Sequence, residues 1–135
     1  MKLESGNGSL EVIRLDAGPP GTPADGDLRV SVRVSVHGYS AKGESWVLAV
    51  AFVQFIDRLE ILEGKRRGKA VLESMSPDDL KLEFYSTDSA GHMAVKGHVG
   101  WHDPSGHFQQ LRFGFDFEPD KLPGIVRGFK KLAVF

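Results

Sequence analysis

The feature that most constrains this fold is one strongly apolar run at helical spacing, residues 46–63, set among segments that alternate with a period of two. When each residue is rotated by about 100°, the large apolar side chains fall on one stripe. That stripe consists of Leu48, Phe52, Phe55, Ile56, Leu59 and Leu62. The run predicts a helix that covers the apolar face of a sheet. Ser45 is its expected N-cap, and Gly64 is the expected residue at its C-terminal end.

Strand-like alternation is clearest from Leu28 to Val36, where Leu or Val occupies every second position and Arg or Ser stands between them. This pattern is typical of an antiparallel strand with one buried face and one solvated face. Gly, Pro, Asp and Ser clusters separate the other strand-like segments. Those segments are residues 9–16, 39–45, 70–75, 80–87, 93–101 and 110–117. In the last two, the alternation places Trp101, Phe113 and Phe115 on the inward face.

Two further segments complete the predicted organisation. Ala17 to Asp27 is rich in Gly and Pro and predicts a flexible surface loop. After Glu118, a second helix is predicted from the apolar spacing of Leu122, Ile125, Val126, Phe129 and Leu132. The fold class is therefore α+β, in one domain over residues 1–135. We expect a curved, mostly antiparallel sheet of about seven strands with two helices packed on it, in the order β-β-β-α-β-β-β-β-α.

Composition narrows the classes of function. The chain has 17 Lys and Arg against 18 Asp and Glu, so its net charge of −1 argues against general nucleic-acid binding. It has no cysteine, which excludes disulfides, thiolate catalysis and cysteine-based zinc sites. No apolar stretch reaches the roughly 20 residues of a membrane helix, and the N-terminus lacks the apolar core of a signal peptide. We expect a cytoplasmic protein that does not associate with a membrane.

Motifs for catalysis or for metal binding are weak. Four of the five histidines lie between positions 92 and 107, but strand geometry separates them. His98 and His102 share a face yet lie about 13 Å apart along a strand, whereas zinc ligands must meet at about 2 Å from one ion. Neither a G-x-S-x-G nor a G-x-G-x-x-G sequence occurs. We therefore expect no cofactor, no metal and no enzymatic activity.

Four blocks of the chain follow a recognisable core pattern. They are Phe52-x2-Phe55-x3-Leu59-x4-Gly64-x3-Gly68-x-Ala70-x-Leu72-x-Ser74, then Leu80-x-Leu82-x-Phe84, then the strand from Gly91 to Val99, and finally Leu111-x-Phe113-x-Phe115 with Leu122-x2-Ile125-x2-Gly128. Over roughly residues 28–132 these blocks resemble the WapI family of bacterial immunity proteins. His92-Met93-Ala94, inserted before Val95, departs from the pattern.

The resemblance implies a non-enzymatic antidote that binds the C-terminal domain of a contact-dependent or polymorphic toxin, often a nuclease, in the cytoplasm. It implies no fixed binding residues, so the candidate contact surfaces come from this sequence alone. One is the acidic set Asp57, Glu60 and Glu63 on the first predicted helix, which would suit a basic nuclease cleft. The other is the basic sheet face that carries Lys96, His98 and Arg112.

Three alternatives remain open at this stage. Val47, Val50 and Ile61 lie away from the main helical stripe, so either the 17–27 loop or the closing helix covers them, or they contact a partner or a second copy. A homodimeric scaffold without any further partner is one such case. The rival function is a small-molecule carrier or enzyme with a pocket between helix and sheet, lined by Phe52, Phe84, Trp101, Phe113 and Phe129.

Overall fold

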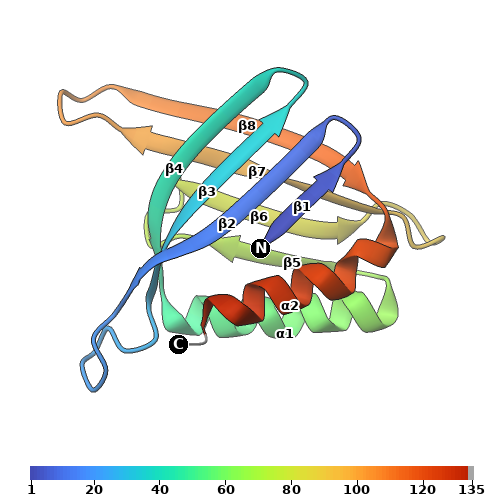
Figure 1. Ribbon diagram of the computed structural model, residues 1–135, viewed down its shortest axis with the longest axis horizontal. Helices are drawn as coiled ribbons and strands as arrows, with labels where there is room; N and C mark the ends of the chain where they lie inside the picture. The colour runs from blue at the N-terminus through green and yellow to red at the C-terminus, as the bar shows by residue number, and fades with distance from the viewer. Residues whose placement is uncertain (134–135) are drawn as a thin grey trace.

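Two four-stranded antiparallel sheets and two helices make up the protein in a computed structural model that describes residues 1–133 (Figure 1). The first sheet has the order β1(Lys2–Ser5), β2(Gly8–Ala17), β3(Leu28–Val36), β4(Tyr39–Val47). The second has the order β5(Lys69–Glu73), β6(Leu80–Ser86), β7(Met93–His102), β8(Phe108–Phe117). The α+β class and the order of elements are confirmed. Residues 1–133 form eight strands in two sheets instead of about seven in one, and the additional strand is β1, which is too short for its alternation to be recognised.

The β3–β4 hairpin forms as the sequence predicts. β3 spans Leu28–Val36, and Val36 pairs with Tyr39 across a two-residue turn. Both turn residues, His37 and Gly38, have positive φ values of 51° and 85°. A turn with this geometry matches the right-handed twist of the flanking strands, and Gly adopts it without a steric cost.

The helix α1 spans Ala49–Lys65, and both of its ends differ from the prediction. Ser45 lies inside β4, so it does not cap the helix. The cap instead comes from Asp27, whose Oδ1 accepts a hydrogen bond of 2.8 Å from the Ala49 backbone N–H. At the other end Arg66, not Gly64, adopts the left-handed conformation with φ 58°. The Arg66 N–H donates to the Leu62 carbonyl, which satisfies one of the last helical acceptors.

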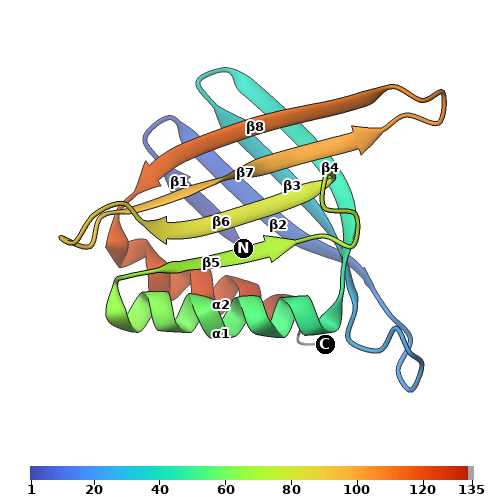
Figure 2. The same ribbon diagram turned by 180° about the vertical axis from the view of Figure 1, so that it is seen from behind.

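The core fills the space between the two crossing sheets and is closed by the helices (Figures 1 and 2). Its centre is a cluster of phenylalanine rings. Phe129 lies edge-on to Phe55 at 4.8 Å between ring centroids and to Phe84 at 5.8 Å. Where the first sheet crosses the second, the approach is so close that a methyl group added to Gly8 would lie 2.3 Å from Cγ of Phe115. This crossing therefore requires glycine at that position.

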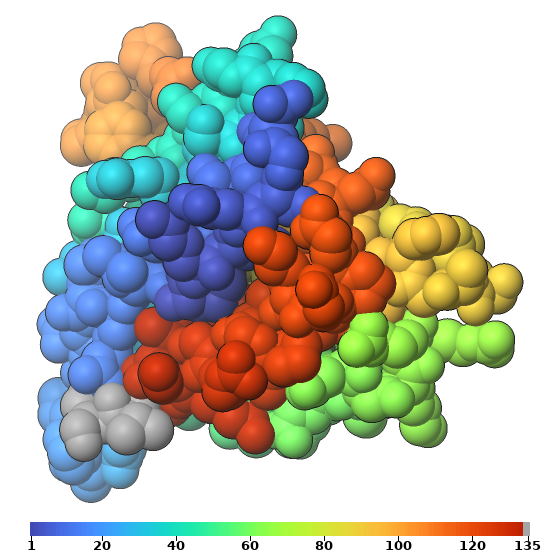
Figure 3. All heavy atoms as spheres, turned by 45° about the vertical axis from the view of Figure 1, so that its right-hand side comes forward, coloured from blue at the N-terminus to red at the C-terminus, as the bar shows by residue number. Residues whose placement is uncertain are grey.

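The closing helix α2 spans Leu122–Leu132 and follows a short 3-10 turn, η1(Pro119–Lys121). All five apolar residues predicted for its buried face are buried. In Figure 3 it lies between the N-terminal strand and the C-terminal end of α1. Lys130 of α2 forms an ion pair of 3.0 Å with Glu60 of α1. Neither this helix nor any other in the described range is long and apolar enough to cross a membrane.

Candidate functional site

The outer face of the second sheet brings Lys96, His98 and Arg112 together, as the sequence predicts. His98 of β7 lies directly opposite Arg112 of β8, and Lys96 precedes His98 by two positions on β7. With Lys81 and Glu83 of β6, these side chains line a shallow open cleft of about 380 Å³. The strands hold the three residues in one place because side chains two apart on a strand share a face.

Side chains of this protein partly neutralise or hydrogen-bond the charged groups of this cleft. The Lys96 ammonium lies 3.5 Å from a Glu83 carboxylate oxygen and 4.9 Å from the centroid of the Tyr85 ring. Arg112 Nε donates to Gln110 Oε1 at 3.4 Å. Exposed contacts of this kind contribute about 0–1 kcal/mol, so they orient the side chains without withdrawing them from a partner.

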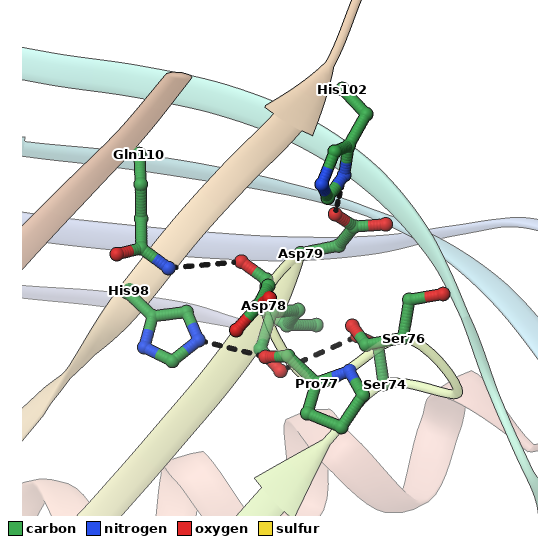
Figure 4. A network of polar contacts seen from close by, with 9 residues as sticks. Ser74, Ser76, Pro77, Asp78, Asp79, His98, His102 and Gln110 are labelled. Carbon is green, nitrogen blue, oxygen red and sulfur yellow. Dashed lines mark hydrogen bonds and ion pairs between the residues drawn. The ribbon is translucent and has the colours of Figure 1, made fainter. Parts of the chain in front are cut away.

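His98 has a second role that the sequence does not reveal. Together with Gln110 and His102 it fastens the turn at residues 76–79 to the outer face of the sheet (Figure 4). His98 Nε2 lies 2.8 Å from the Pro77 carbonyl oxygen, and Gln110 Nε2 donates to the Asp78 carbonyl at 3.1 Å. These turn residues carry acceptors without a strand partner, so the side chains of β7 and β8 supply the missing donors.

The remaining histidines do not form a metal site. His102 Nδ1 lies 3.0 Å from Asp79 Oδ1, and His92 pairs with Asp88 in an exposed loop. The hydrogen bond from His92 lowers the pKa of Asp88, and the same contact raises the pKa of His92. Within residues 1–133 no group of three or more potential ligands is arranged to hold an ion.

The three carboxylates predicted on the first helix point to different places. Successive residues three apart on a helix drift by about 60°, so Asp57, Glu60 and Glu63 do not stack on one line. Glu60 faces α2 and pairs with Lys130. Asp57 is exposed and lines the groove between α1 and β5. Glu63 is half-buried and forms no ion pair among the described residues. A single acidic patch is therefore absent from this side of α1 over residues 1–133.

Three apolar side chains on the outward side of α1 are exposed. Val50 is 62% exposed and Val53 is 58% exposed, and Ile61 is exposed on the same side. Neither the 17–27 loop nor α2 covers these side chains, so the first of the two alternatives, covering within the chain, is wrong for Val50 and Ile61. Val47 belongs to β4 and is buried. The other alternative, contact with a partner or with a second copy, stays a prediction for Val50 and Ile61.

Beside that face runs an open groove of about 1010 Å³ between α1 and β5, which lies next to the helix in Figure 2. Its helical wall is formed by Ala51, Gln54, Phe55, Asp57, Arg58 and Ile61, and its strand wall by Lys69, Val71 and Glu73. Sequence reasoning missed this groove. The available signal is Val71, an apolar side chain at an outward position of a strand whose inward positions are Ala70 and Leu72.

Trp101 corrects another prediction. It was expected in the core, yet 53% of it is exposed, and Phe108 is exposed as well. The β7–β8 hairpin extends past the first sheet in Figure 1, and Trp101 lines an open cleft with Ser40, Ala41 and Lys42 of β4 instead of being enclosed. Leu111, Phe113 and Phe115 on β8 are only partly buried for a related reason, since the tips of β1 to β3 meet this strand at few points.

The pocket expected between helix and sheet is occupied by the protein itself. Phe52, Phe84 and Phe129 belong to the buried core, and the last two are in ring contact. The rings fill the space that a ligand would need. The fold and these surfaces thus define a small α+β domain with a packed interior, whose polar clusters and grooves lie open on the outside.

Comparison with known proteins shows the family to which this α+β domain belongs. Residues 2–133 match the model of the immunity protein WapI-like family, and the chain belongs to that family. The match covers nearly the whole chain and extends the resemblance predicted over residues 28–132. No curated protein and no solved structure matches the chain.

Proposed function

We propose that this protein is a non-enzymatic immunity protein that binds the C-terminal domain of a cognate polymorphic or contact-dependent toxin and neutralises it in the cytoplasm. The observation that carries the proposal is the match to the immunity protein WapI-like family over residues 2–133. A packed aromatic core is consistent with it, because the interior then stabilises the fold and the exterior is free for contact.

The exposed apolar surface also favours a protein partner. Val50 and Val53 on α1, with Trp101 on the overhanging hairpin, are large side chains that water solvates poorly. Tryptophan in particular is enriched among the residues that carry most of the binding energy at protein interfaces. A homodimer would use the same surfaces, and light scattering distinguishes a dimer from a complex that requires a toxin.

If the neighbouring upstream gene encodes a large secreted protein with a variable C-terminus, the direct test is co-expression with the C-terminal domain of that protein. We expect that domain to arrest growth alone, to be tolerated in the presence of this protein, and to co-purify with it. Growth arrest that this protein does not relieve, with no co-purification, would contradict the proposal.

Charge reversal then maps the contact. Asp57→Lys with Glu63→Lys tests α1, and Lys96→Glu with Arg112→Glu tests the sheet face. Glu4→Lys, an exposed change on β1, serves as the control for altered net charge. We expect at least one of the two double variants to weaken toxin binding about tenfold or more while the control does not. Unchanged binding by both would show that neither predicted surface makes contact.

A further inference from the structure

One edge of the second sheet is open at β8. β8 pairs with β7 alone, whereas the strand at the opposite edge, β5, lies beside α1. In Figure 2 no other segment lies beside the end of β8 that follows the β7–β8 turn. The first sheet meets β8 toward its other end, where Gly8 lies against the Phe115 ring and Ser5 Oγ donates to Glu118. The first half of the β8 edge therefore has room for another strand.

Two hydrogen bonds give the direction of the backbone groups along β8. The Asp103 N–H donates to the His107 carbonyl at 2.7 Å, and the Gly100 N–H donates away from β8, to the Asp79 carbonyl, at 2.9 Å. In an antiparallel ladder the direction alternates from one residue to the next. The backbone groups of even-numbered β8 residues therefore point to the open edge. Among residues 1–133 these groups have no hydrogen-bond partner at Phe108, Gln110 and Arg112.

Exposed aromatic side chains lie on both sides of this edge. Tyr39, at the tip of the β3–β4 hairpin, is 71% exposed, and Trp101 on β7 is 53% exposed. Tyr39 lines an open cleft of about 370 Å³, Trp101 lines another of about 390 Å³, and Leu111 of β8 lines both. In Figure 1 the β3–β4 turn reaches past the edge of β8. An unpaired edge flanked by exposed aromatic rings is typical of a surface that associates.

The sequence of β8 suits pairing with a second copy of itself. About a two-fold axis beside Leu111, residues equally far from the axis on the two antiparallel strands lie opposite each other. Leu111 then meets Leu111 of the second copy on the inward face. On the outward face, Arg112 lies opposite Gln110 of the second copy, and Phe108 lies opposite Gly114. Each cation thus faces an amide oxygen that accepts a hydrogen bond, and each ring covers a glycine.

Neighbouring registers fit less well. An axis beside Arg112 would set the two guanidinium groups against each other. An axis further along β8 would bring the β3–β4 turns of the two copies together, because this turn lies next to residues 111–114. An axis beside Gln110 would set the apolar Leu111 against the polar Gln109 of the second copy. With a net charge of −1 on each chain, two copies repel each other little at long range.

We propose that two copies of this chain form a two-fold symmetric dimer in which their β8 edges pair antiparallel about an axis beside Leu111. The two second sheets then become one continuous sheet. The overhanging β3–β4 turn of each copy lies over the β7–β8 hairpin of the other, so that Tyr39 approaches Gln109 of the second copy. Gln109 pairs across the hairpin with Trp101, so the two exposed aromatic side chains cover each other. This dimer requires no toxin and leaves α1 free.

The mass of the purified protein in solution tests the dimer directly. Pairing of two short strands buries less than a standard interface, so we expect a dissociation constant of about 1–100 µM. Light scattering and sedimentation velocity should give twice the mass of one chain at high concentration and the mass of one chain after dilution. The mass of a single chain at a protein concentration of about 1 mM would overturn the proposal.

Amide hydrogen exchange locates the contact without any substitution. The amides of residues 108, 110 and 112 exchange fast in the monomer, because no hydrogen bond protects them. We expect their exchange to slow about threefold or more between a concentration well below the dissociation constant and one well above it. Dimerisation without protection of these amides would place the interface elsewhere and overturn the proposal.

Opposite charges introduced at Gln110 test the register. Gln110→Glu places a carboxylate opposite Arg112 of the second copy and should lower the dissociation constant about fivefold. Gln110→Lys places a like charge there and should raise it about fivefold. An axis beside Gln110 itself would instead make both variants weaken the dimer, since each would face its own copy. Weakening by Gln110→Glu would therefore refute the assigned register.

Matched control variants lie at the far end of the molecule, in the β2–β3 loop. Thr22→Glu and Thr22→Lys introduce the same charges at an exposed position. Both should leave the dissociation constant within about twofold of the wild-type value, since charges beyond a Debye length are screened. Equal effects at Thr22 and at Gln110 would show that net charge alone controls the association, against the proposal. Thermal unfolding verifies that all four variants are folded.

Discussion

The capping of α1 by Asp27 leads to a sharp prediction about stability. Asp27 belongs to the β2–β3 connection, 22 residues before the helix it caps, and its side chain is only 9% exposed. The Ala49 N–H, which donates this hydrogen bond to Asp27, is one of the four backbone donors that have no partner within the helix at its start. Asp27→Ala would leave this half-buried donor without its partner and remove a negative charge from the positive end of the helix dipole.

The size of the effect follows from these two contributions. Loss of a cap costs about 1 kcal/mol, and loss of the charge adds about 0.5 kcal/mol. We expect Asp27→Ala to lower the free energy of unfolding by about 1.5 kcal/mol, which lowers the Tm by about 4–8 °C. Asp27→Asn retains an oxygen acceptor and should lose only about 0.5 kcal/mol. Urea unfolding monitored by circular dichroism measures both changes.

Two control variants make the test decisive. Asp25→Ala alters an exposed carboxylate of the same loop that accepts from the Gly21 N–H, and it should cost less than about 0.5 kcal/mol. Ser45→Ala removes the residue that sequence reasoning favoured as the cap, and it should cost less than Asp27→Ala because Ser45 lies inside β4 and does not cap the helix. If Ser45→Ala costs more than Asp27→Ala, or if Asp27→Ala matches Asp25→Ala, the capping by Asp27 is refuted.

Three further outcomes are expected. Phe129→Ala should lower the free energy of unfolding by about 3–5 kcal/mol in urea titrations, because Phe129 is fully buried against the rings of Phe55 and Phe84; a loss below about 1 kcal/mol would contradict this. Gly8→Ala should cost about 1–3 kcal/mol, since its methyl group would meet the Phe115 ring, and an unchanged Tm would show that the sheets can separate there. The imidazole of His92 should titrate by NMR with a midpoint above 6.5, because its hydrogen bond to Asp88 raises its pKa, and Asp88→Asn should remove the shift. The pair contributes stability between the ordinary pKa values of the two groups, about 4 to 6.5. That contribution is lost as pH rises through the raised pKa of His92, and again as pH falls through the lowered pKa of Asp88.

Elements whose periodicity extends over several residues were predictable. The bounds of β3 agree with the alternation of Leu28 to Val36, and every apolar residue on the predicted face of α2 is buried. In a strand every second side chain must leave water, and in a helix every third or fourth side chain must do so. Few other conformations bury side chains at that spacing. The family resemblance rested on the same core positions, which explains why it extended to nearly the whole chain.

The candidate sites were less predictable, because exposure depends on what lies opposite a side chain. Trp101 has the same inward phase as Val99, yet Val99 is buried, whereas Trp101, near the end of β7, lines an open cleft beside β4. Lys96, His98 and Arg112 were correctly placed on one face, since register in a hairpin follows from the turn. The engagement of His98 with Pro77 depends on a turn that folds over from another strand, and alternation carries no information about that.

By itself the amino-acid sequence determined most of the segments that become strands and helices, β1 excepted, and most of their buried sides, because both depend on the spacing of apolar residues along the chain. Only the tertiary structure decided that Asp27 caps α1, that Val50 and Trp101 stay in water, and that one edge of β8 remains unpaired. Each of these depends on contacts between segments distant in sequence. The number of strands and the angle at which the two sheets cross determine those contacts, and no local pattern of residues specifies either.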